Sequence, residues 1–409
     1  MRSVDEQISR LLSTIEALEP FPVSLTDARG CIASEPVQAL RMLPLFDSAG
    51  VDGYALIASD VINASVDSPV SLEVLDRVMP GRIPTSILRS GYAARVFIGS
   101  HLPENTQAVI SLDDVEELET SIRVVKAVEY GANIRYTAED VREGDVVIDE
   151  GQLIGPTQIA LLASIGRGSI TCYPRPRIVV LSIGSDLLEP GTALTPGKIT
   201  DTNGVMLASA VVDSGGIAYR VGPIGDDPHS IQRVLEEQLV RADLVIAVGG
   251  SSSTAYDSLF KVCQEIGEIE YASIAIHPKI AHGFGRIGEE NIPIIVLPGN
   301  PVTAFLAFEI FVKPVIMKLR GVETFGERSY HSALLDGRIG STPGKRHFVR
   351  ATFEIDEQGR NRVTPLENQA VHLIKGLAET ECLIIIPESV LEVNDGDIVD
   401  ILMLSGIDS

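Results

Sequence analysis

A regular alternation of strand-like and helix-like segments between Arg177 and Arg320 constrains the fold more than any other feature. Short apolar runs predict strands at Ile178–Ile183, Ala218–Ile224, Leu244–Val248, Ala272–Ile276 and Ile292–Leu297. Helical periodicity between them predicts helices at Thr202–Ser214, Pro228–Arg241, Asp257–Ile266 and Val302–Arg320. This alternation is typical of a doubly wound, mostly parallel sheet, which binds ligands beyond the carboxyl ends of its strands.

Two of the loops that follow strands are candidates for anion binding. Pro298-Gly299-Asn300-Pro301 connects the last strand to the helix from Val302, and Gly249-Gly250-Ser251-Ser252-Ser253-Thr254 follows the strand-like Asp243–Val248. Backbone N–H groups at a helix start bind anions, glycine permits close approach, and proline at the first helical position loses only an orphaned donor. Either loop alone is typical of an ordinary strand–helix turn. Together they predict a phosphate-bearing ligand.

The flanking regions have different patterns. An apolar helical rhythm over Val4–Glu19 predicts a helix that ends before Pro20. Alternating residues with many turn signals predict an all-β insert from about Val70 to Val128, and Thr157–Ser164 predicts a short helix. From about Phe325 the chain is again mainly β, interrupted by a helix-like segment at Ala370–Ala378.

Composition excludes several classes of protein. A formal net charge of −23 argues against general nucleic-acid binding, because such proteins are basic. The 4 cysteines are far apart and form no Cys-x-x-Cys motif, which argues against structural zinc or a disulfide framework. No apolar stretch approaches the ~20 residues of a membrane span, and the N-terminal residues lack the apolar core of a signal peptide. We therefore expect a cytoplasmic protein.

Acidic residues recur at the ends of the predicted elements. Carboxylates are the oxygen ligands that Mg²⁺ prefers, so a cluster of them would hold Mg²⁺ against an anionic ligand. The alternative is structural: helix N-capping, turn formation, or an ordinary solvated loop position. N-capping is the alternative for Asp201 and Asp257, turn formation for Asp52 and Asp140, and the loop position for Asp186.

Five segments, in order along nearly the whole chain, resemble the molybdopterin molybdenumtransferase (MoeA) family, which includes the E domain of gephyrin. Val4–Leu18 resembles the opening helix, and Pro44–Ala55 resembles Pro-x-Phe-Asp-x-Ser-x-Met-Asp-Gly-Tyr-Ala. Asn133–Arg135 with Glu139-Asp140 resembles Asn-Ile-Arg…Gly-Glu-Asp. Lys198–Asn203 resembles Gly-x-Ile-x-Asp-x-Asn, and Leu297–Pro301 resembles Leu-Pro-Gly-Asn-Pro. The overall pattern is similar to that of actinobacterial gephyrin-like proteins.

The resemblance implies an elongated homodimer with four domains in each subunit. These are a discontinuous helical and β N-terminal dimerisation domain (1–46 and 142–174), a β-rich insert (47–141), a doubly wound, MogA-like molybdopterin-binding α/β domain (175–324) and a small β C-terminal domain (325–409). It implies insertion of molybdate into adenylylated molybdopterin with release of AMP, in the presence of Mg²⁺. The active cleft would lie between the α/β domain of one subunit and its partner.

The site residues are carried over position by position. The resemblance implies catalytic carboxylates at Asp52, Asp140, Asp201 and Asp257, with Asp201 and Asp257 also binding Mg²⁺. The residues implied to bind the pterin and its phosphates are Gly249, Gly250, Ser251, Ser252, Ser253, Asp186, His277, Lys279, Pro298, Gly299, Asn300 and Pro301.

The chain departs from the family pattern in this same pocket. Thr254 replaces the last glycine of the family's Gly-Gly-Val-Ser-x-Gly loop, and its β-branch resists positive φ. His277 and Ile280 replace two lysines of Lys-Pro-Gly-Lys-Pro, with Lys279 as a partial substitute. Losing two fixed cations weakens anion binding, and a histidine supplies charge only when protonated. Further departures are Ile98 for a threonine, Asp186 for a glutamate, and Lys375-Gly376 for a serine pair.

Two functions from different classes remain open at this point. The first is a working molybdenum insertase with a divergent pocket. The second is a dimeric, gephyrin-like scaffold that binds a partner peptide, such as a membrane receptor segment or the C-terminal tail of the cell-division protein FtsZ, with recruitment to the division septum. Phe348 and Phe353 are candidate groove residues for the scaffold, although packing in a strand core is the alternative role for both.

Overall fold

The computed structural model describes residues 1–249, 253–322 and 330–404, and the side chains of residues 253–256 lie outside the described part. The chain forms two compact units. The first comprises Met1–Phe21, Gly30–Ser34 and Thr171–Ser409, and the second comprises Pro22–Arg29 and Glu35–Ile170.

The first unit is built around a six-stranded sheet with the order β17-β14-β18-β22-β21-β19. Its four parallel strands are β14 (Arg177–Ile183), β17 (Ile217–Ile224), β18 (Leu244–Gly249) and β22 (Ile292–Leu297). These are the strands that the apolar runs predict, with ends shifted by one residue at most. The predicted α/β architecture is confirmed.

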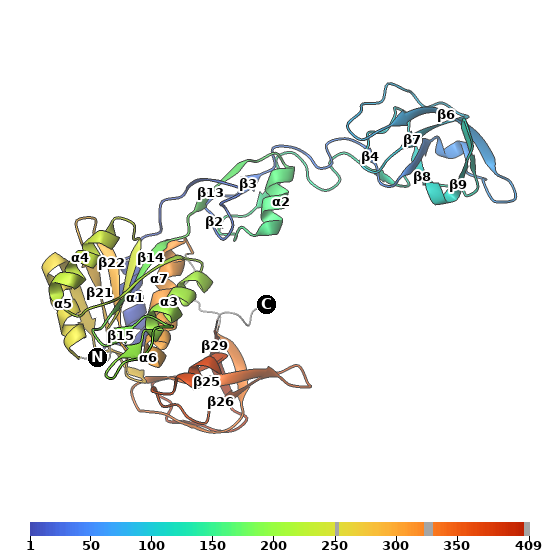
Figure 1. Ribbon diagram of the computed structural model, residues 1–409. Helices are drawn as coiled ribbons and strands as arrows, with labels where there is room; N and C mark the ends of the chain where they lie inside the picture. The colour runs from blue at the N-terminus through green and yellow to red at the C-terminus, as the bar shows by residue number, and fades with distance from the viewer. Residues whose placement is uncertain (250–252, 323–329, 405–409) are drawn as a thin grey trace. The chain divides into compact units, whose positions relative to one another are not determined.

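Successive residues of the central strands point into two different apolar cores. Ile178 and Val180 of β14 belong to one core, and Val179 and Leu181 belong to the other. Helices α1 (Val4–Ser13), α3 (Thr202–Asp213), α6 (Pro301–Ala307) and α7 (Lys313–Leu319) cover the first face. Helices α4 (Pro228–Leu239) and α5 (Ser253–Ile266) cover the second (Figure 1). Period-two alternation with apolar side chains on both faces is what a doubly covered sheet requires.

The expected strand at Ala272–Ile276 is wrong in detail. This segment divides between β19 (Gly267–Ala272), an antiparallel edge strand, and β20 (Ile276–His277), which belongs to another sheet. A strand that the sequence did not indicate, β21 (His282–Ile287), pairs antiparallel with both β19 and β22. Its glycines are the reason: a Cβ on Gly285 would lie 1.9 Å from the Glu268 carbonyl oxygen, so only glycine permits the pairing.

Three helices also differ from their expected bounds. The first helix ends at Ser13 rather than Glu19, where the hydroxyls of Ser13 and Thr14 donate to the carbonyls of Arg10 and Leu11. The helix expected over Val302–Arg320 contains a π-helical turn at Phe308–Val312, just before Pro314, which has no N–H to continue the ladder. Helix α5 begins at Ser253, four residues before the expected start.

The C-terminal part of the first unit is a small barrel. Strands β25 (Arg346–Ile355), β26 (Asn361–Pro365), β23 (His331–Leu335), β29 (Ile398–Met403) and β27 (Cys382–Ile386) follow in that order, and β27 pairs back with β25. The expected helix-like interruption is α8 (Ile374–Ala378). Strand β20 adds to this sheet by parallel pairing with β25. The predicted β character of this region is confirmed.

The second unit carries a sheet with the order β8-β5-β7-β6-β10-β9. Its strands are β5 (Gly53–Leu56), β6 (Val70–Val78), β7 (Tyr92–Val96), β8 (Ala108–Ser111), β9 (Val115–Glu117) and β10 (Ser121–Val124). Two short pairs, β4 (Ser48–Ala49) with β11 (Ile134–Arg135) and β3 (Val37–Gln38) with β12 (Val146–Ile148), lead to helix α2 (Pro156–Ser164). The predicted β insert is present.

Among the described helices, none combines the length and the apolar character that crossing a membrane requires.

Candidate functional site

Several of the predicted ligand-binding positions that the structure describes lie at one edge of the sheet of the first unit. The register of the parallel strands sets Ile183 beside Gly249, and Val248 beside Leu297. Three described positions therefore lie at this edge: Gly249 at the end of β18, Asp186 just after β14, and the Pro298–Pro301 segment after β22. This is the edge at which doubly wound sheets bind ligands.

A direct hydrogen bond joins the start of helix α3 to the loop after β22. The side-chain Nδ2 of Asn203, in the first turn of α3, donates to the carbonyl oxygen of Gly299 at 2.7 Å. The other side-chain atom, Oδ1 of Asn203, is buried without a hydrogen-bond partner in the described part of the chain. Asn300 caps α6, because its side chain accepts from the N–H of Thr303 at 3.1 Å. The Pro298–Pro301 loop is thus held in place from both sides.

Asp201 is the N-cap of α3 and is 1% exposed. One of its carboxylate oxygens accepts from the N–H of Gly204 at 2.9 Å, and the other accepts from Nη2 of Arg220 at 3.0 Å. The structural alternative for Asp201 is therefore present: both oxygens already have protein donors.

Arg220, on β17, balances this carboxylate. Its two terminal nitrogens contact Glu189 at 2.5 and 2.6 Å, so that one guanidinium bridges two acidic residues. These hydrogen bonds raise the pKa of Arg220, with Glu189 as the larger cause, and keep it charged. Among the residues that the structure describes, its Nε is buried without a partner, as is Oγ of Ser182 near the end of β14.

Gly204 is required by the crowding around Asp201. A Cβ at this position would lie 2.4 Å from Oδ2 of Asp201, 2.6 Å from Oγ of Ser182 and 2.9 Å from Nε of Arg220. Sequence reasoning named Asp201 but missed Ser182, Gly204 and Arg220. The glycine three residues after an N-cap was a local signal, whereas Arg220 comes from a different strand and has none.

Asp186 lies in a loop that folds over this edge. Strands β15 (Leu187–Leu188) and β16 (Ile199–Thr200) pair in parallel, and the N–H of Ile199 donates to the Asp186 carbonyl at 2.8 Å. The ammonium of Lys198 donates to the carbonyl of Ser185. Asp186 is half-buried and placed beside the carboxyl end of β14, as expected for a ligand-facing loop.

The replaced lysine positions behave differently from one another. Ile280 is 3% exposed and is part of the apolar core of the sheet, so it cannot be replaced by a cation without opening that core. The ring of His277 packs edge-on against His347, with centroids 4.5 Å apart. Burial and the charge of Lys345 lower the pKa of His277, which leaves it neutral near pH 7. Lys279 is exposed and is the cation that this segment offers.

Asp257 does not stand at the start of its helix, where the sequence pattern placed it. It is exposed on α5, four residues after the helix begins, and so is not an N-cap. Gly250, Ser251 and Ser252 lie outside the described residues, as do the side chains of Ser253 and Thr254.

Asp52 and Asp140 belong to the second unit and are both exposed. Oδ1 of Asp52 accepts from the N–H of Ile98 at 2.8 Å, which is a bond between distant segments rather than the local turn formation given as its alternative. The next residue must be glycine, because a Cβ on Gly53 would lie 1.8 Å from the carbonyl oxygen of Ile110. The N–H of Asp140 donates to the Leu43 carbonyl at 3.0 Å.

The donor set tests whether these residues hold Mg²⁺ by themselves. In the described residues no group of three or more His, Cys, Asp or Glu side chains is arranged to hold a metal ion. Both carboxylate oxygens of Asp201 already accept hydrogen bonds, one from an N–H and one from a guanidinium. Asp257 is an exposed carboxylate, and in the described residues it belongs to no such group. The described side chains therefore do not fit a preformed Mg²⁺ cage.

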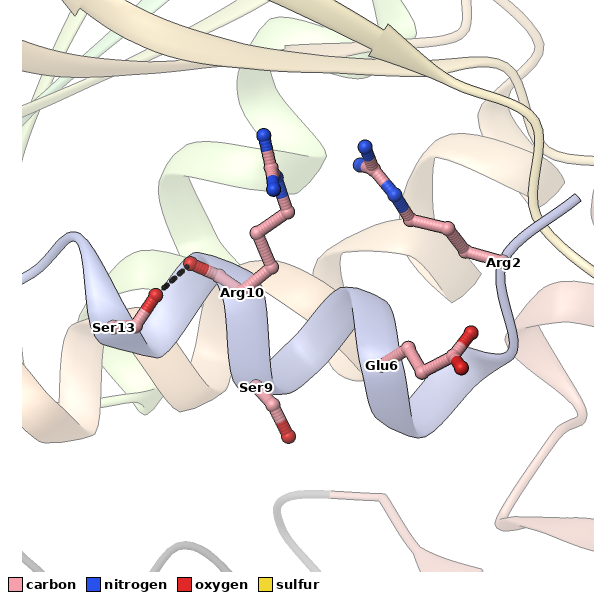
Figure 2. Close-up of a pocket in the computed structure, with 5 residues that line it drawn as sticks. All are labelled: Arg2, Glu6, Ser9, Arg10 and Ser13. Atoms are coloured by element: carbon pink, nitrogen blue, oxygen red, sulfur yellow. Dashed lines mark hydrogen bonds between the residues drawn. The ribbon is translucent and has the colours of Figure 1, made fainter.

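A surface pocket of about 620 Å³ lies elsewhere, along helix α1. Figure 2 shows Arg2 and Arg10 projecting to one side of this helix, while Ser9 points away. Both arginines are bound by Glu270 of β19. None of the predicted site residues lines this pocket, and its two arginines are already paired.

Comparisons with known proteins agree with this architecture over the whole chain. Residues 2–166 match the MoeA N-terminal region (domain I and II), residues 179–318 match a probable molybdopterin binding domain, and residues 332–404 match the MoeA C-terminal region (domain IV). A crystal structure of a molybdopterin biosynthesis MoeA protein from Pyrococcus horikoshii is 28% identical, with a TM-score of 0.76, and covers 98% of each chain. The fold is that of a protein of molybdenum cofactor biosynthesis.

Relatives with curated names show the same extent of similarity. Molybdopterin molybdenumtransferase 1 of Mycobacterium tuberculosis is 32% identical over 99% of this chain and 99% of its own. Molybdopterin molybdenumtransferase 2 of that organism is 34% identical over 97% and 98%. The chain belongs to the MoeA family.

Proposed function

We propose that this chain is a molybdopterin molybdenumtransferase, which inserts molybdate into adenylylated molybdopterin and releases AMP. The observation that carries the proposal is the convergence of Asp186, Asp201, Asn203 and the Pro298–Pro301 loop at the carboxyl ends of adjacent parallel strands. The full-length similarity to relatives of that name supports it.

The residues of the first unit divide into two roles in this proposal. The Pro298–Pro301 loop and Gly249 offer backbone groups to the pterin and its phosphates, because glycine permits close approach. Asp201 holds Arg220 and the start of α3 in place and thereby fixes Asn203 against Gly299. Asp257 is the exposed carboxylate that remains available to the bound nucleotide.

In this proposal Mg²⁺ binds together with the nucleotide and is not held by the protein alone. Magnesium in phosphate-binding sites commonly takes one or two carboxylates, with the remaining ligands supplied by phosphates and water. The described carboxylates do not form a cage, so we expect Mg²⁺ to strengthen nucleotide binding without binding detectably to the protein alone. Calorimetric titrations with Mg²⁺ alone and with nucleotide in its presence and absence distinguish these outcomes.

We infer that the working molecule is a homodimer, in which the partner completes the cleft with carboxylates from its second unit. Asp52 and Asp140 are the proposed contributions. Sedimentation equilibrium should give twice the chain mass of 43.9 kDa. A monomer that remains active would remove these two residues from the proposal.

Complementation tests the function directly. The chain is expressed in a host that lacks its own molybdenum insertase, and a molybdoenzyme is assayed at ordinary molybdate levels. We expect activity with the natural sequence and with Glu265→Gln, an exposed carboxylate on the same helix, and loss of activity with Asp257→Asn. Full activity of Asp257→Asn would overturn the assignment of that residue.

The scaffold alternative is not favoured. Phe348, one of its candidate groove residues, is 2% exposed and packs in the core of the sheet, and Phe353 packs against the barrel core. Binding of an FtsZ tail, and the septal location that it would bring, remain predictions for the case in which a folded protein fails to complement. A peptide-binding measurement that survives Asp257→Asn would then separate scaffold from enzyme.

A further inference from the structure

Two cysteines lie side by side where two short strands of the first unit pair. Strand β2 (Ile32–Ala33) runs antiparallel to β13 (Ser169–Tyr173), and Cys172 lies opposite Ala33. Cys31 immediately precedes β2, two residues before Ala33, and so lies diagonally across from Cys172. The two thiols are within hydrogen-bond distance of each other, and no disulfide joins them.

Two arginines converge on the same place. Arg320 donates through Nη2 to the carbonyl of Gly30 at 3.0 Å and through Nη1 to the carbonyl of Ser214 at 3.1 Å. Arg175 donates to the carbonyls of Gly215 and Gly216 at 3.1 and 2.6 Å. Within the described residues the hydrogen-bond partners of both guanidiniums are neutral groups, and Nε of Arg320 is buried without a partner. Two cations held by neutral carbonyls favour an anion between them.

The sequence did not indicate this cluster, because Cys31 and Cys172 are far apart along the chain and show no redox spacing. Their surroundings differ from those of the other cysteines. Burial alone raises the pKa of Cys263 to about 12. A hydrogen bond from Cys172, the N–H of Arg175 and the two guanidiniums instead lower the pKa of Cys31 to about 7.

We propose that Cys31 and Cys172 are a redox-active dithiol that closes to a disulfide, with Cys31 as the attacking thiolate. Cys31 is 4% exposed and Cys172 is fully buried, so Cys31 is the one that an oxidant reaches. Cys172 is positioned to resolve the intermediate because its thiol is the hydrogen-bond partner of Cys31.

The oxidant is a low-molecular-weight disulfide, and the exchange balances as follows. The Cys31 thiolate attacks one sulfur of the oxidant, forms a mixed disulfide and releases the first small thiolate. Cys172 then loses its proton to that thiolate and attacks Sγ of Cys31, releasing the second small thiolate, which takes a proton from solvent. Two protein thiols lose two electrons, and the oxidant becomes two small thiols.

The position of this disulfide gives it a consequence for the chain. Residues 35–170 of the second unit leave the first unit just after Cys31 and return just before Cys172. A bond between these cysteines would close the whole intervening segment into a covalent ring.

Peptide mass spectrometry of the full-length protein tests the proposal. Reduced protein is incubated with oxidised glutathione, unfolded in the presence of iodoacetamide, digested, and compared with a sample treated afterwards with dithiothreitol. We expect a dithiothreitol-sensitive peptide pair that joins Cys31 to Cys172, while Cys263 and Cys382 are recovered alkylated. Absence of that pair in a protein whose circular dichroism is native would overturn the proposal, as would equal oxidation of all four cysteines.

Variants extend the test to the order of events. Cys172→Ser should stop at the mixed disulfide and accumulate one glutathione on Cys31, whereas Cys263→Ser, the matched control, should form the ring as the natural chain does. Cys31 in the folded protein should react with iodoacetamide near pH 7 at least ~10-fold faster than Cys263. Equal rates for the two would contradict the role of the arginines. If Cys172→Ser does not fold, the comparison of the alkylation rates of Cys31 and Cys263 in the natural chain still tests the proposal.

Discussion

The carboxylate of Asp201 is where single residues matter most in this molecule. Its two oxygens hold the start of α3 and the guanidinium of Arg220, and Gly204 leaves just enough room for both. A buried carboxylate with both oxygens bonded is stabilising only while each partner remains in place. The crowding around it therefore predicts sensitivity to a single methyl group.

Gly204→Ala should lower the free energy of unfolding by about 1–3 kcal/mol, the usual cost of an overpacked buried position. Urea unfolding followed by circular dichroism measures this. Gly340→Ala is the matched control, because a Cβ at Gly340 meets nothing within 4 Å. Equal effects of the two substitutions would show that the space around Asp201 is not limiting.

Burial of His282 makes stability depend on pH. The side chain is fully buried against Gln7 and Phe311, and burial lowers its pKa from 6.5 to about 4. The unfolded chain thus binds a proton between these pH values that the folded chain does not. Stability is unaffected above pH 6.5 and falls as pH drops below it, by at most ~1.4 kcal/mol per pH unit.

We expect this histidine to account for about 1 kcal/mol of the stability lost between roughly pH 7.5 and 5.5. The free energy of unfolding, measured by urea titration, should therefore change with pH by that amount less in His282→Gln than in the natural chain, whatever the effect of the substitution at neutral pH. His331→Gln, at an exposed histidine, should leave the pH dependence unchanged. An unchanged slope in His282→Gln would contradict the prediction.

At the level of secondary structure, the Pro298–Pro301 loop depends on the cap of α6. The Asn300 side chain accepts from Thr303 N–H, and Asn203 holds the neighbouring Gly299 carbonyl. The cap fixes where the loop ends, and the proposed ligand contacts depend on that position.

Asn300→Ala should cost ~1 kcal/mol of stability, while Asn300→Asp, which keeps an acceptor at the N-cap, should cost much less. Nucleotide binding by the alanine variant should weaken at a temperature where the protein is still folded. Fluorescence or calorimetric titration measures this. Weaker binding in the aspartate variant alone would point to charge repulsion rather than to the cap.

Sequence patterns predicted the continuously apolar strands β14, β18 and β22 and missed β21. β14, β18 and β22 are buried on both faces, so their composition shows them directly. β21 contains Gly283 and Gly285, whose role is to let the backbone of β19 approach, and no local preference reveals that. In the same way, Asp201 could be predicted from the start of its helix, whereas Arg220 reaches it from a separate strand by tertiary packing alone.

At the scale of the whole molecule, the proposed inserted domain of residues 47–141 contains its apolar cores entirely. Both clusters of the insert, one around Leu56 and Ile110 and the other around Ala55 and Val96, draw every buried member from this range. The C-terminal barrel differs, because Phe348, Leu383 and Ile385 are part of the core of the α/β sheet.

A fragment of residues 47–141 should therefore fold alone with a cooperative urea transition, and a fragment of residues 330–404 should not. Circular dichroism and one-dimensional proton spectra of the two fragments check this. A cooperative transition in the C-terminal fragment of the same midpoint as the full chain would show that the shared core contributes little.

Strand β20 links the C-terminal barrel to the α/β sheet, although it contains only two residues. Ile276 and His277 pair with the C-terminal barrel, and Pro278 separates them from Lys279, a proposed ligand-binding cation, and from Ile280, which is buried in the core of the α/β sheet. The segment is a tether between two bodies. A movement of the barrel against the sheet would strain both the β20–β25 pairing and the shared apolar core, so we expect the position of Lys279 to be coupled to that of the barrel.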